Sequence, residues 1–493
     1  MAIHTMIKIW MYIDDILKEF RPCFSRKAAF SWFMVVIVGL MVRSDHLGVS
    51  SILRELLLDP NKYTTMIHFF HSTAWNLEKI QEKWLKIVKD TGLISYIHGR
   101  IVLIGDGVKQ AKEAKKTPGV KKLHQESSDS TKSEYIRGFL FGGLGVLVGG
   151  ATKLFCLPLS MAIHDGNKAI LEWKESEYKD DTHVTRLIRE ACKSAEALGE
   201  SCWLLMDSYF LSGPGLKAIT EETAKAGHEL VTLITKAKDH YTAWWKPISF
   251  DPDDKRTRPK VRDSFNIKDL FKNTEDFIEE TLTIYGESTK VKYLCVNLLW
   301  NRELFQEIRF VLVVMDGVKT ILASTGLDLD PCKIIELYCY RFKIETFFRA
   351  FKQVLAGFAC HFWCDRMPIF KQFATVGEMA AKLADVTDKI SRDSIINTYD
   401  AIEGFVLFAC ISMGLIQICS LKFSDLINQS EQRWLRTKTN IIPAEETTQL
   451  CLRFSLRYTC CKLRKLALVT AIWDRRPANS DQSESTDDIL KSA

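Results

Sequence analysis

The stretch YCYRFKIETFFRAFK, residues 338–352, combines apolar residues at helical spacing with four polar residues at intervals of 3, 4 and 7. The four polar residues are Tyr338, Arg341, Glu345 and Lys352. At about 100° per residue, one continuous helix would hold all four within an arc of roughly 60°. An ordinary solvent-exposed helix face with an Arg341–Glu345 ion pair at i,i+4 would show the same spacing, so the helix alone does not identify a site.

Two aspartates follow short apolar runs that are typical of buried strands. Residues 101–104 precede Asp106, and residues 203–206 precede Asp207. Such acids are often only caps or turn formers, but two of them can converge with an acid on a helix where neighbouring elements of a sheet end. Carboxylate oxygens are the ligands that Mg²⁺ prefers, and two such ions about 4 Å apart can assist both sides of a phosphodiester exchange.

The sequence therefore predicts that Asp106, Asp207 and Glu345 form a catalytic, metal-binding carboxylate site. Asp165 and Asp316, each in an Asp-Gly turn after an apolar run, are the alternatives to Asp106.

The four spaced residues and the two aspartates together resemble a known family. Tyr338-x2-Arg341-x3-Glu345-x6-Lys352 is similar to the Y-R-E-K pattern of bacterial insertion-sequence transposases of the DDE class. Asp106 in LIGDG and Asp207 in LLMDSYF resemble the first and second catalytic aspartates of that family. The stretches KTPGVK (116–121), YIRG (135–138) and FW (362–363) agree with it. The chain departs from it at Gly138-Phe139, where members often have Gly-His, and at Gly326, where members often have Asp.

This resemblance implies an α/β fold with an RNase H-like catalytic core that is interrupted by a β-rich insertion. It also implies an enzyme that binds the terminal inverted repeats of its element, cleaves a strand and transfers it to target DNA, with two Mg²⁺ ions that Mn²⁺ can replace. Tyr338, Arg341 and Lys352 would contact the DNA near the cut, and two copies of the chain would act as a homodimer. A related two-metal nuclease, or an impaired copy that only binds element ends, are the alternatives.

We expect six segments along the chain. They are a helical N-terminal DNA-binding domain (1–97), the first part of the catalytic core (98–216), a β-rich insertion (217–326), the second part of the core with the Glu345 helix (327–370), a helical C-terminal region (371–475) and a disordered tail (476–493). Within the core, a charged helix over residues 177–198 is expected to expose Arg186, Arg189, Glu190 and Lys193.

A run of basic residues follows Asp106. The predicted DNA contacts among them are Lys109, Lys116, Lys121 and Lys122. Runs of like charge are usually solvated faces, but beside a site that cuts phosphodiesters, contact with the DNA backbone is the better interpretation. Trp244, Trp245 and Trp300 in the insertion could stack on a displaced base, although packing is the default role for such residues.

Composition and hydropathy indicate which broad class of protein this is: globular, membrane-spanning or secreted. The net charge is +6 with 47% hydrophobic residues, which is typical of a globular protein. The longest apolar run identified, residues 30–42, falls short of the roughly 18 residues that span a bilayer, and no secretory signal is visible. We therefore expect no membrane partner, and the resemblance implies a cytoplasmic, nucleoid-associated prokaryotic protein. The Gly-rich residues 142–150 lack the spacing of a nucleotide-binding loop.

Overall fold

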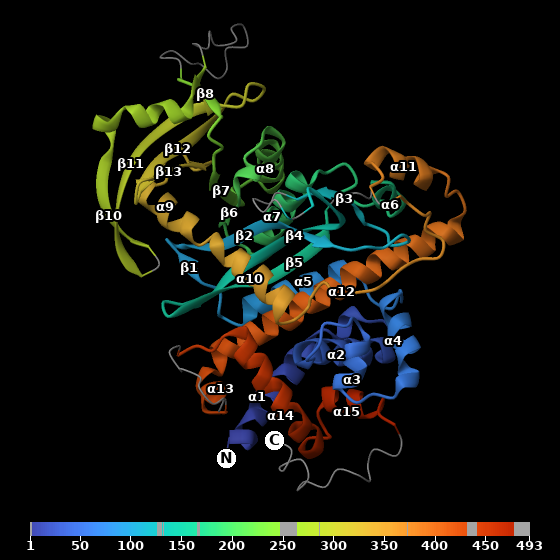
Figure 1. Ribbon diagram of the computed structural model, residues 1–493. Coiled ribbons are helices and arrows are strands. Elements are labelled where there is room, and N and C mark those ends of the chain that lie inside the picture. The colour runs from blue at the N-terminus through green and yellow to red at the C-terminus, as the bar shows by residue number, and fades with distance from the viewer. Residues whose placement is uncertain are drawn as a thin grey trace.

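The computed structural model describes residues 2–125, 131, 133–164, 168–246, 264–284, 286–371, 373–430 and 441–477. The fold is mixed α/β, with a central sheet that carries a β lobe at one end and a body of helices beneath it (Figure 1). The expected tail lies outside the described residues from 478 onward, as does the alternative acid Asp165.

The central sheet contains antiparallel and parallel pairs. Its strands are β1 (Tyr96–Ile97), β2 (Arg100–Ala111), β3 (Lys121–His124), β4 (Tyr135–Gly150), β5 (Lys153–Ile163), β6 (Cys202–Leu205) and β7 (Val231–Lys236). β2, β4 and β5 form an antiparallel meander, and β6 and β7 continue the sheet from β2 in parallel. All four residues of β6 are buried, as expected for a parallel strand that is covered on both faces. This arrangement is consistent with an α/β nuclease-like core.

Helices cover both faces of the sheet beside Asp106. A Cβ atom at Gly105 would lie 3.3 Å from Leu187 of α7 (His183–Leu198), whereas one at Gly143, the β4 partner of Asp106, would lie 3.0 Å from Phe348 of α10 (Phe342–Gln353). Successive residues of a strand point to opposite faces. Alternation along β2 therefore directs Asp106 towards α10 and its two glycine neighbours towards α7.

The β-rich part of the chain begins later than the sequence predicted. Residues 213–236 form α8 (Gly213–Ala226) and β7, which pairs with β6, so this segment continues the core sheet. The strands beyond it are β8 (Thr242–Trp244), β9 (Phe265–Asn266), β10 (Ile278–Ile284), β11 (Glu287–Trp300), β12 (Gln306–Met315) and β13 (Val318–Ser324). β13 pairs with β7, and β10 to β13 make up the curved lobe at the upper left of Figure 1. Asp316 lies in the turn between β12 and β13, within this lobe.

The N- and C-terminal helices form one body rather than two separate regions. Its long helices are α1 (Ala2–Glu19), α2 (Lys27–Val42), α5 (Leu77–Asp90), α12 (Lys389–Lys422) and α14 (Glu445–Lys462), with the short α15 (Ala467–Trp473). α2 is buried almost throughout and packs against α12, α14 and α15. Trp10 donates to Ser455 at 2.9 Å, and the backbone amide of Leu468 donates to Asp14 at 2.7 Å. Segments from the two ends of the chain thus complete a single core.

α12 is the central helix of this body. It packs on β5 on one side and on α2 on the other, and it crosses the molecule below the sheet in Figure 1. By length and composition alone it could cross a membrane, but 94% of its apolar window is buried inside the protein. Its hydropathy is therefore explained by its place in the core.

Candidate active site

Asp106 lies within β2, not at its end as predicted, because the strand continues to Ala111. The carboxylate faces α10, and its Oδ1 accepts a hydrogen bond from the Gly107 amide at 2.7 Å. Burial raises the pKa of Asp106 to about 6; the Gly107 amide and Arg341 oppose this effect, and the nearby Asp207 and Glu345 add to it. Asp106 is thus a carboxyl group whose ionisation depends on a neighbouring cation.

The single helix expected over residues 338–352 is two helices. α9 (Pro331–Cys339) ends at Tyr340, and α10 begins after Arg341, with i→i+3 backbone bonds from Arg341 to Tyr338 and from Lys343 to Tyr340 at the junction. Tyr338 therefore sits on a different helix from Glu345, and the expectation of one shared helical arc was wrong. The break does not separate the functional groups, because the junction lies over the site.

Arg341 connects two of the three predicted acids. Its Nη1 lies 3.3 Å from Asp106 Oδ2, and its Nη2 forms an ion pair with Glu345 Oε1. Its side chain is only 17% exposed, and although burial lowers its pKa, the pairing with Tyr338 and both acids raises it further above the ordinary arginine value. One guanidinium thus occupies the position between a strand acid and a helix acid.

Asp207 and Tyr338 complete the group. Asp207 caps the 3-10 turn η3 (Ser208–Phe210) by accepting from the Ser208 amide at 2.6 Å, and its own carbonyl accepts from Thr235 of β7 at 2.8 Å. Burial raises the pKa of Tyr338 to about 12, with further raising contributions from Asp207, Asp106 and Glu345. The same hydroxyl therefore lies within electrostatic range of all three acids.

The carboxylates of this group are ligands that a divalent cation prefers. The described side chains are not arranged to hold one, however. Asp106 and Glu345 already share a cation, the Arg341 guanidinium. Over the described ranges, no group of three or more His, Cys, Asp or Glu side chains is close enough to hold a metal ion. A metal would therefore have to displace Arg341 from at least one carboxylate.

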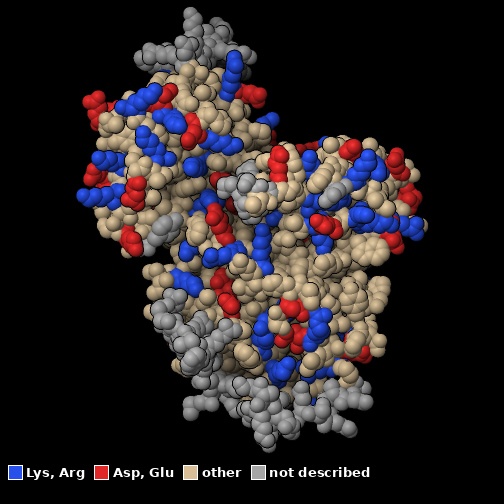
Figure 2. Space-filling view, in the orientation of Figure 1, with Lys and Arg blue, Asp and Glu red and all other residues tan. Residues whose placement is uncertain are grey.

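The lysines that are predicted to contact DNA divide into two sets. Lys352 lies next to the acids, and the others lie on β2, β3 and the segment between them. Lys352 Nζ lies 3.4 Å from the Lys109 carbonyl, next to the site, and burial lowers the pKa of Lys352. Lys109 Nζ donates to the His124 carbonyl, while Lys122 lies 3.7 Å from the centre of the Tyr135 ring. Lys121 is buried, and Lys116 donates to the Asp365 carbonyl. On the face shown in Figure 2, basic and acidic side chains are mixed across the middle of the molecule beneath the β lobe.

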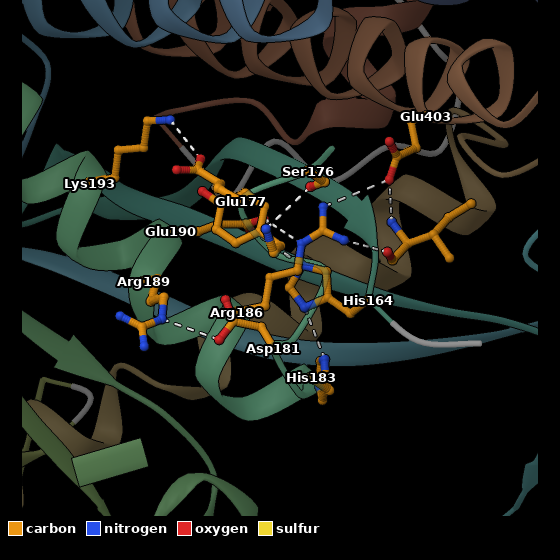
Figure 3. A network of polar contacts seen from close by, with 12 residues as sticks. His164, Ser176, Glu177, Asp181, His183, Arg186, Arg189, Glu190, Lys193 and Glu403 are labelled. Carbon is orange, nitrogen blue, oxygen red and sulfur yellow. Dashed lines mark hydrogen bonds and ion pairs between the residues drawn. The ribbon is translucent and has the colours of Figure 1, made fainter. Parts of the chain in front are cut away.

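A pair of glycines opposite each other in the sheet makes room for two histidines that the sequence analysis did not identify. Gly107 on β2 pairs with Gly142 on β4. A Cβ atom at Gly107 would lie 2.7 Å from the His183 ring, and one at Gly142 would lie 2.1 Å from the His164 ring. The two rings contact each other, Nδ1 to Nδ1, at 3.1 Å (Figure 3). The Gly-rich stretch therefore serves packing beside Asp106.

His183 also contacts the residues that follow Asp207. Its ring centre lies 5.4 Å from that of Phe210 and 6.2 Å from that of Tyr209. Burial lowers the pKa of His183 to about 3, so the ring is neutral at ordinary pH. The neutral His183 ring thus lies between Gly107, next to Asp106, and the turn that follows Asp207. The signal in the sequence was the glycine that follows Asp106. Because glycine has no side chain, a side chain from another element must fill the space beside it.

The histidines end a buried ionic network that reaches α12 (Figure 3). His164 Nε2 lies 3.4 Å from Glu190 Oε2, Arg186 Nε donates to Glu190 at 3.1 Å, and Arg186 lies 3.9 Å from Glu403 of α12. Burial raises the pKa of Glu190, but His164 and Arg186 outweigh this effect and bring it to about 2. The expectation that Arg186 and Glu190 are surface residues was wrong, because this face of α7 turns towards α12 and its acid Glu403. Lys193 is exposed as expected, whereas Arg189 is part-buried and pairs with Asp181, Glu221 and Glu222.

A cavity of about 1080 Å³ adjoins this network between α5, α7 and α12. Arg186, Glu190 and Glu403 line it, whereas Asp106, Asp207 and Glu345 do not. The three acids therefore lie outside this cavity, and Asp106 and Glu345 meet on the face of the sheet that α10 covers.

Comparison with known proteins gives one family match. Residues 19–161 match the model of the DDE superfamily endonuclease family. The matched segment contains Asp106 and ends before Asp207 and Glu345. No curated protein and no solved structure matches the chain. The family match supports a DDE-type transposase and, with it, an endonuclease type of enzyme that acts on DNA.

Proposed function

We propose that the chain is a DNA transposase that binds the terminal inverted repeats of its own element, cleaves a strand and transfers it to target DNA. The observation that carries this proposal is the placement of Arg341 between Asp106 and Glu345, with Asp207 and Tyr338 beside them. Two carboxylates that share a cation, with a third acid near them, supply the residue types of a two-metal phosphodiester exchange. The family match, which implies DNA as the substrate, supports the same conclusion.

Asp106, Asp207 and Glu345 would hold two Mg²⁺ ions, which Mn²⁺ could replace. When bound, such ions activate the attacking oxygen and stabilise the leaving one. Burial raises the pKa of Asp106 to about 6, and a bound cation would favour its ionised form.

The cationic and phenolic side chains would bind the DNA at the site. Arg341, once released from a carboxylate, presents a planar fork that fits a phosphate in two places. Lys352 supplies a compact charge beside the Lys109 backbone, and the Tyr338 hydroxyl remains a hydrogen-bond donor because its pKa is about 12. Lys109, Lys116 and Lys122 would extend the contact along β2, β3 and the segment between them, whereas Lys121 is buried and would not reach the DNA as predicted. These side chains would orient the DNA backbone, and the three acids would act on it.

Two copies of the chain would act together as a homodimer, because both ends of an element must be held before they are joined. The enzyme would act in the cytoplasm of a prokaryote, on its nucleoid. A strand-transfer assay tests the proposal with purified protein, Mg²⁺ and a duplex that carries the inverted repeats flanking this reading frame.

We expect nicked and joined products from the wild type, and binding without products from Glu345→Gln. Asp316→Asn, a change at the other Asp-Gly turn, is the matched control and should retain both activities. Cleavage without joining would favour the two-metal nuclease. A wild type that binds the repeats and never cleaves with Mg²⁺ or Mn²⁺ would favour the impaired copy.

A further inference from the structure

Asp207 stands where the chain leaves the sheet after β6. β6 ends at Leu205, and one more bond of the parallel ladder follows, from the Met206 amide to the Ile234 carbonyl at 3.1 Å. The backbone of Asp207 is still extended, at φ −78° and ψ 166°, and residues 208–210 then form η3. The direction of the Asp207 carboxylate therefore depends on how the start of this turn is held.

A side chain from the neighbouring strand holds the backbone of Asp207. Thr235 of β7 donates its hydroxyl to the Asp207 carbonyl at 2.8 Å, whereas the carbonyl of Lys236 is farther from that hydroxyl, at 3.5 Å. The Phe210 amide donates to the same Asp207 oxygen at 3.0 Å. A carbonyl oxygen has two lone pairs, so one is used by the turn itself and the other by β7. The bond from Thr235 thus fixes the Asp207 peptide relative to the sheet.

Thr235 is suited to this contact by its place in the sheet. Its side chain is fully buried, and β7 lies between β6 and β13, where Thr235 pairs with Ala323 (Figure 1). Threonine is branched at Cβ, which restricts its rotamers, so the hydroxyl of a buried threonine on a central strand keeps its direction. The donor is therefore held in place by the fold itself.

The other end of the turn has an anchor of its own. Tyr241 donates its hydroxyl to the Leu211 carbonyl at 3.0 Å, four residues after Asp207. Loss of the Thr235 bond would therefore leave the segment attached at Leu211 and loosened at Asp207. Asp207 acts electrostatically on Asp106 and on Tyr338, so a rotation at this point would change the geometry of the whole acidic group.

We propose that Thr235 is a positioning residue for strand cleavage, because its hydroxyl holds Asp207 in the direction that the reaction requires. Thr235 is fully buried, so it acts through Asp207 and does not touch the DNA. This inference rests on the proposed function for the reaction itself. It assigns a role to a residue on β7, the strand that we expected to belong to the insertion.

The first test removes the hydroxyl and keeps the shape of the side chain. Thr235→Val should lower kcat for cleavage of the element-end duplex about ten- to hundred-fold and leave KM for the duplex within about two-fold, because the DNA-binding side chains are untouched. Thr235→Ala, which places no methyl group against the carbonyl, should behave in the same way. Thr235→Ser keeps the hydroxyl and should keep most of the activity.

The second test needs neither metal nor activity. The amides of Ser208 and Phe210 both donate to Asp207, one to the carboxylate and one to the carbonyl. In Thr235→Val these amides should exchange their hydrogens about ten-fold faster in EDTA, because the turn opens more often once the Asp207 carbonyl has lost its bond to β7. Hydrogen-exchange mass spectrometry of peptides that cover residues 206–211 measures this.

Thr232→Val is the matched control. Thr232 is 2% exposed on the same strand, and its hydroxyl donates to Glu229 at 2.6 Å instead of to the turn. This variant should have the kcat of the wild type and the same exchange over residues 206–211, and similar melting temperatures for the two valine variants would show that both are folded.

The outcomes separate this inference from the proposed function. A Thr235→Val protein with the kcat and exchange of the wild type, or a Thr232→Val protein with the same losses as Thr235→Val, would overturn the inference. Faster exchange in Thr235→Val, together with a wild type that never cleaves DNA with Mg²⁺ or Mn²⁺, would instead refute the proposed function and leave the hold of Thr235 on Asp207 standing.

Discussion

Arg341 Nη1 lies 3.3 Å from Asp106 Oδ2, and the same guanidinium pairs with Glu345, so one side chain holds together acids that are 239 residues apart (345 − 106). Without divalent ions, this contact offsets the repulsion between two carboxylates. When a metal binds, the contact must weaken. Arg341 and the metal ion therefore compete for the same carboxylate oxygens of Asp106 and Glu345.

We expect Arg341→Met to lower the free energy of unfolding in EDTA by about 1–3 kcal/mol, because a mostly buried Asp106 loses its charged partner. The same variant should show a larger increase in melting temperature on addition of Mg²⁺ than the wild type, because no side chain competes with the ion. Thermal melts with and without about 5 mM Mg²⁺ measure both effects. Equal increases for the two proteins would contradict the competition.

Asp106 predicts a particular dependence of stability on pH. Its folded pKa of about 6 lies above the value of about 3.9 for an unfolded chain, so the folded state binds this proton more tightly. The group therefore destabilises the fold above pH 6, by on the order of 2 kcal/mol, and this cost disappears as the pH falls from 6 towards 4. In EDTA, Asp106→Asn should be more stable than the wild type at pH 8 and equal to it near pH 4. Urea unfolding at both pH values tests this, and a difference that does not change with pH would contradict it.

The paired glycines predict a steric effect on one face of the sheet. Gly142→Ala places a methyl group 2.1 Å from the His164 ring, which is buried, and should lower the free energy of unfolding by about 1–3 kcal/mol or more. Gly150→Ala on the same strand is the control, because nothing lies within 4 Å of its Cβ position. Adding His164→Ala to Gly142→Ala should restore part of the loss. If both glycine variants unfold at the same urea concentration, the packing argument fails.

The ionic network predicts unequal effects along α7. Arg186→Met leaves the buried acids Glu190 and Glu403 without their arginine and should cost about 3–5 kcal/mol. Lys193→Met, four residues from Arg189 on the same helix, removes an exposed pair with Glu177 and should cost less than about 1 kcal/mol. Chemical unfolding of the two variants gives the comparison. Similar losses would show that the network does not tie α12 to the core.

The proximity of Asp106, Arg341 and Glu345 could be predicted because each stands in a short pattern with its own chemistry, whereas their catalytic role stays a prediction. The strands β2 and β6 could be predicted because the apolar runs 101–104 and 203–206 are uninterrupted. The helix break at Tyr340 could not, because residues 338–352 keep an apolar period across it and only the tertiary packing of α9 and α10 decides where the turn falls. The burial of Arg186 and Glu190 could not be predicted either, because their partners His164 and Glu403 are distant in the sequence and charged residues at helical spacing usually face water.

The start of the β-rich segment was misplaced for a related reason. β7 resembles the strands of the insertion in composition, and only its parallel pairing with β6 assigns it to the central sheet. Local sequence thus identifies a strand, but the neighbour of that strand is a property of the whole chain.

The interleaving of α1 and α2 with α14 and α15 has a consequence for synthesis. An emerging N-terminal segment cannot complete the burial of α2 until α12, α14 and α15 have left the ribosome, so part of its apolar surface stays exposed until the chain is almost finished. A premature stop codon in this gene would therefore release a chain that is a target for proteases rather than a folded fragment able to occupy the ends of the element. Shortened copies of the gene should be silent and not act as dominant inhibitors of intact ones.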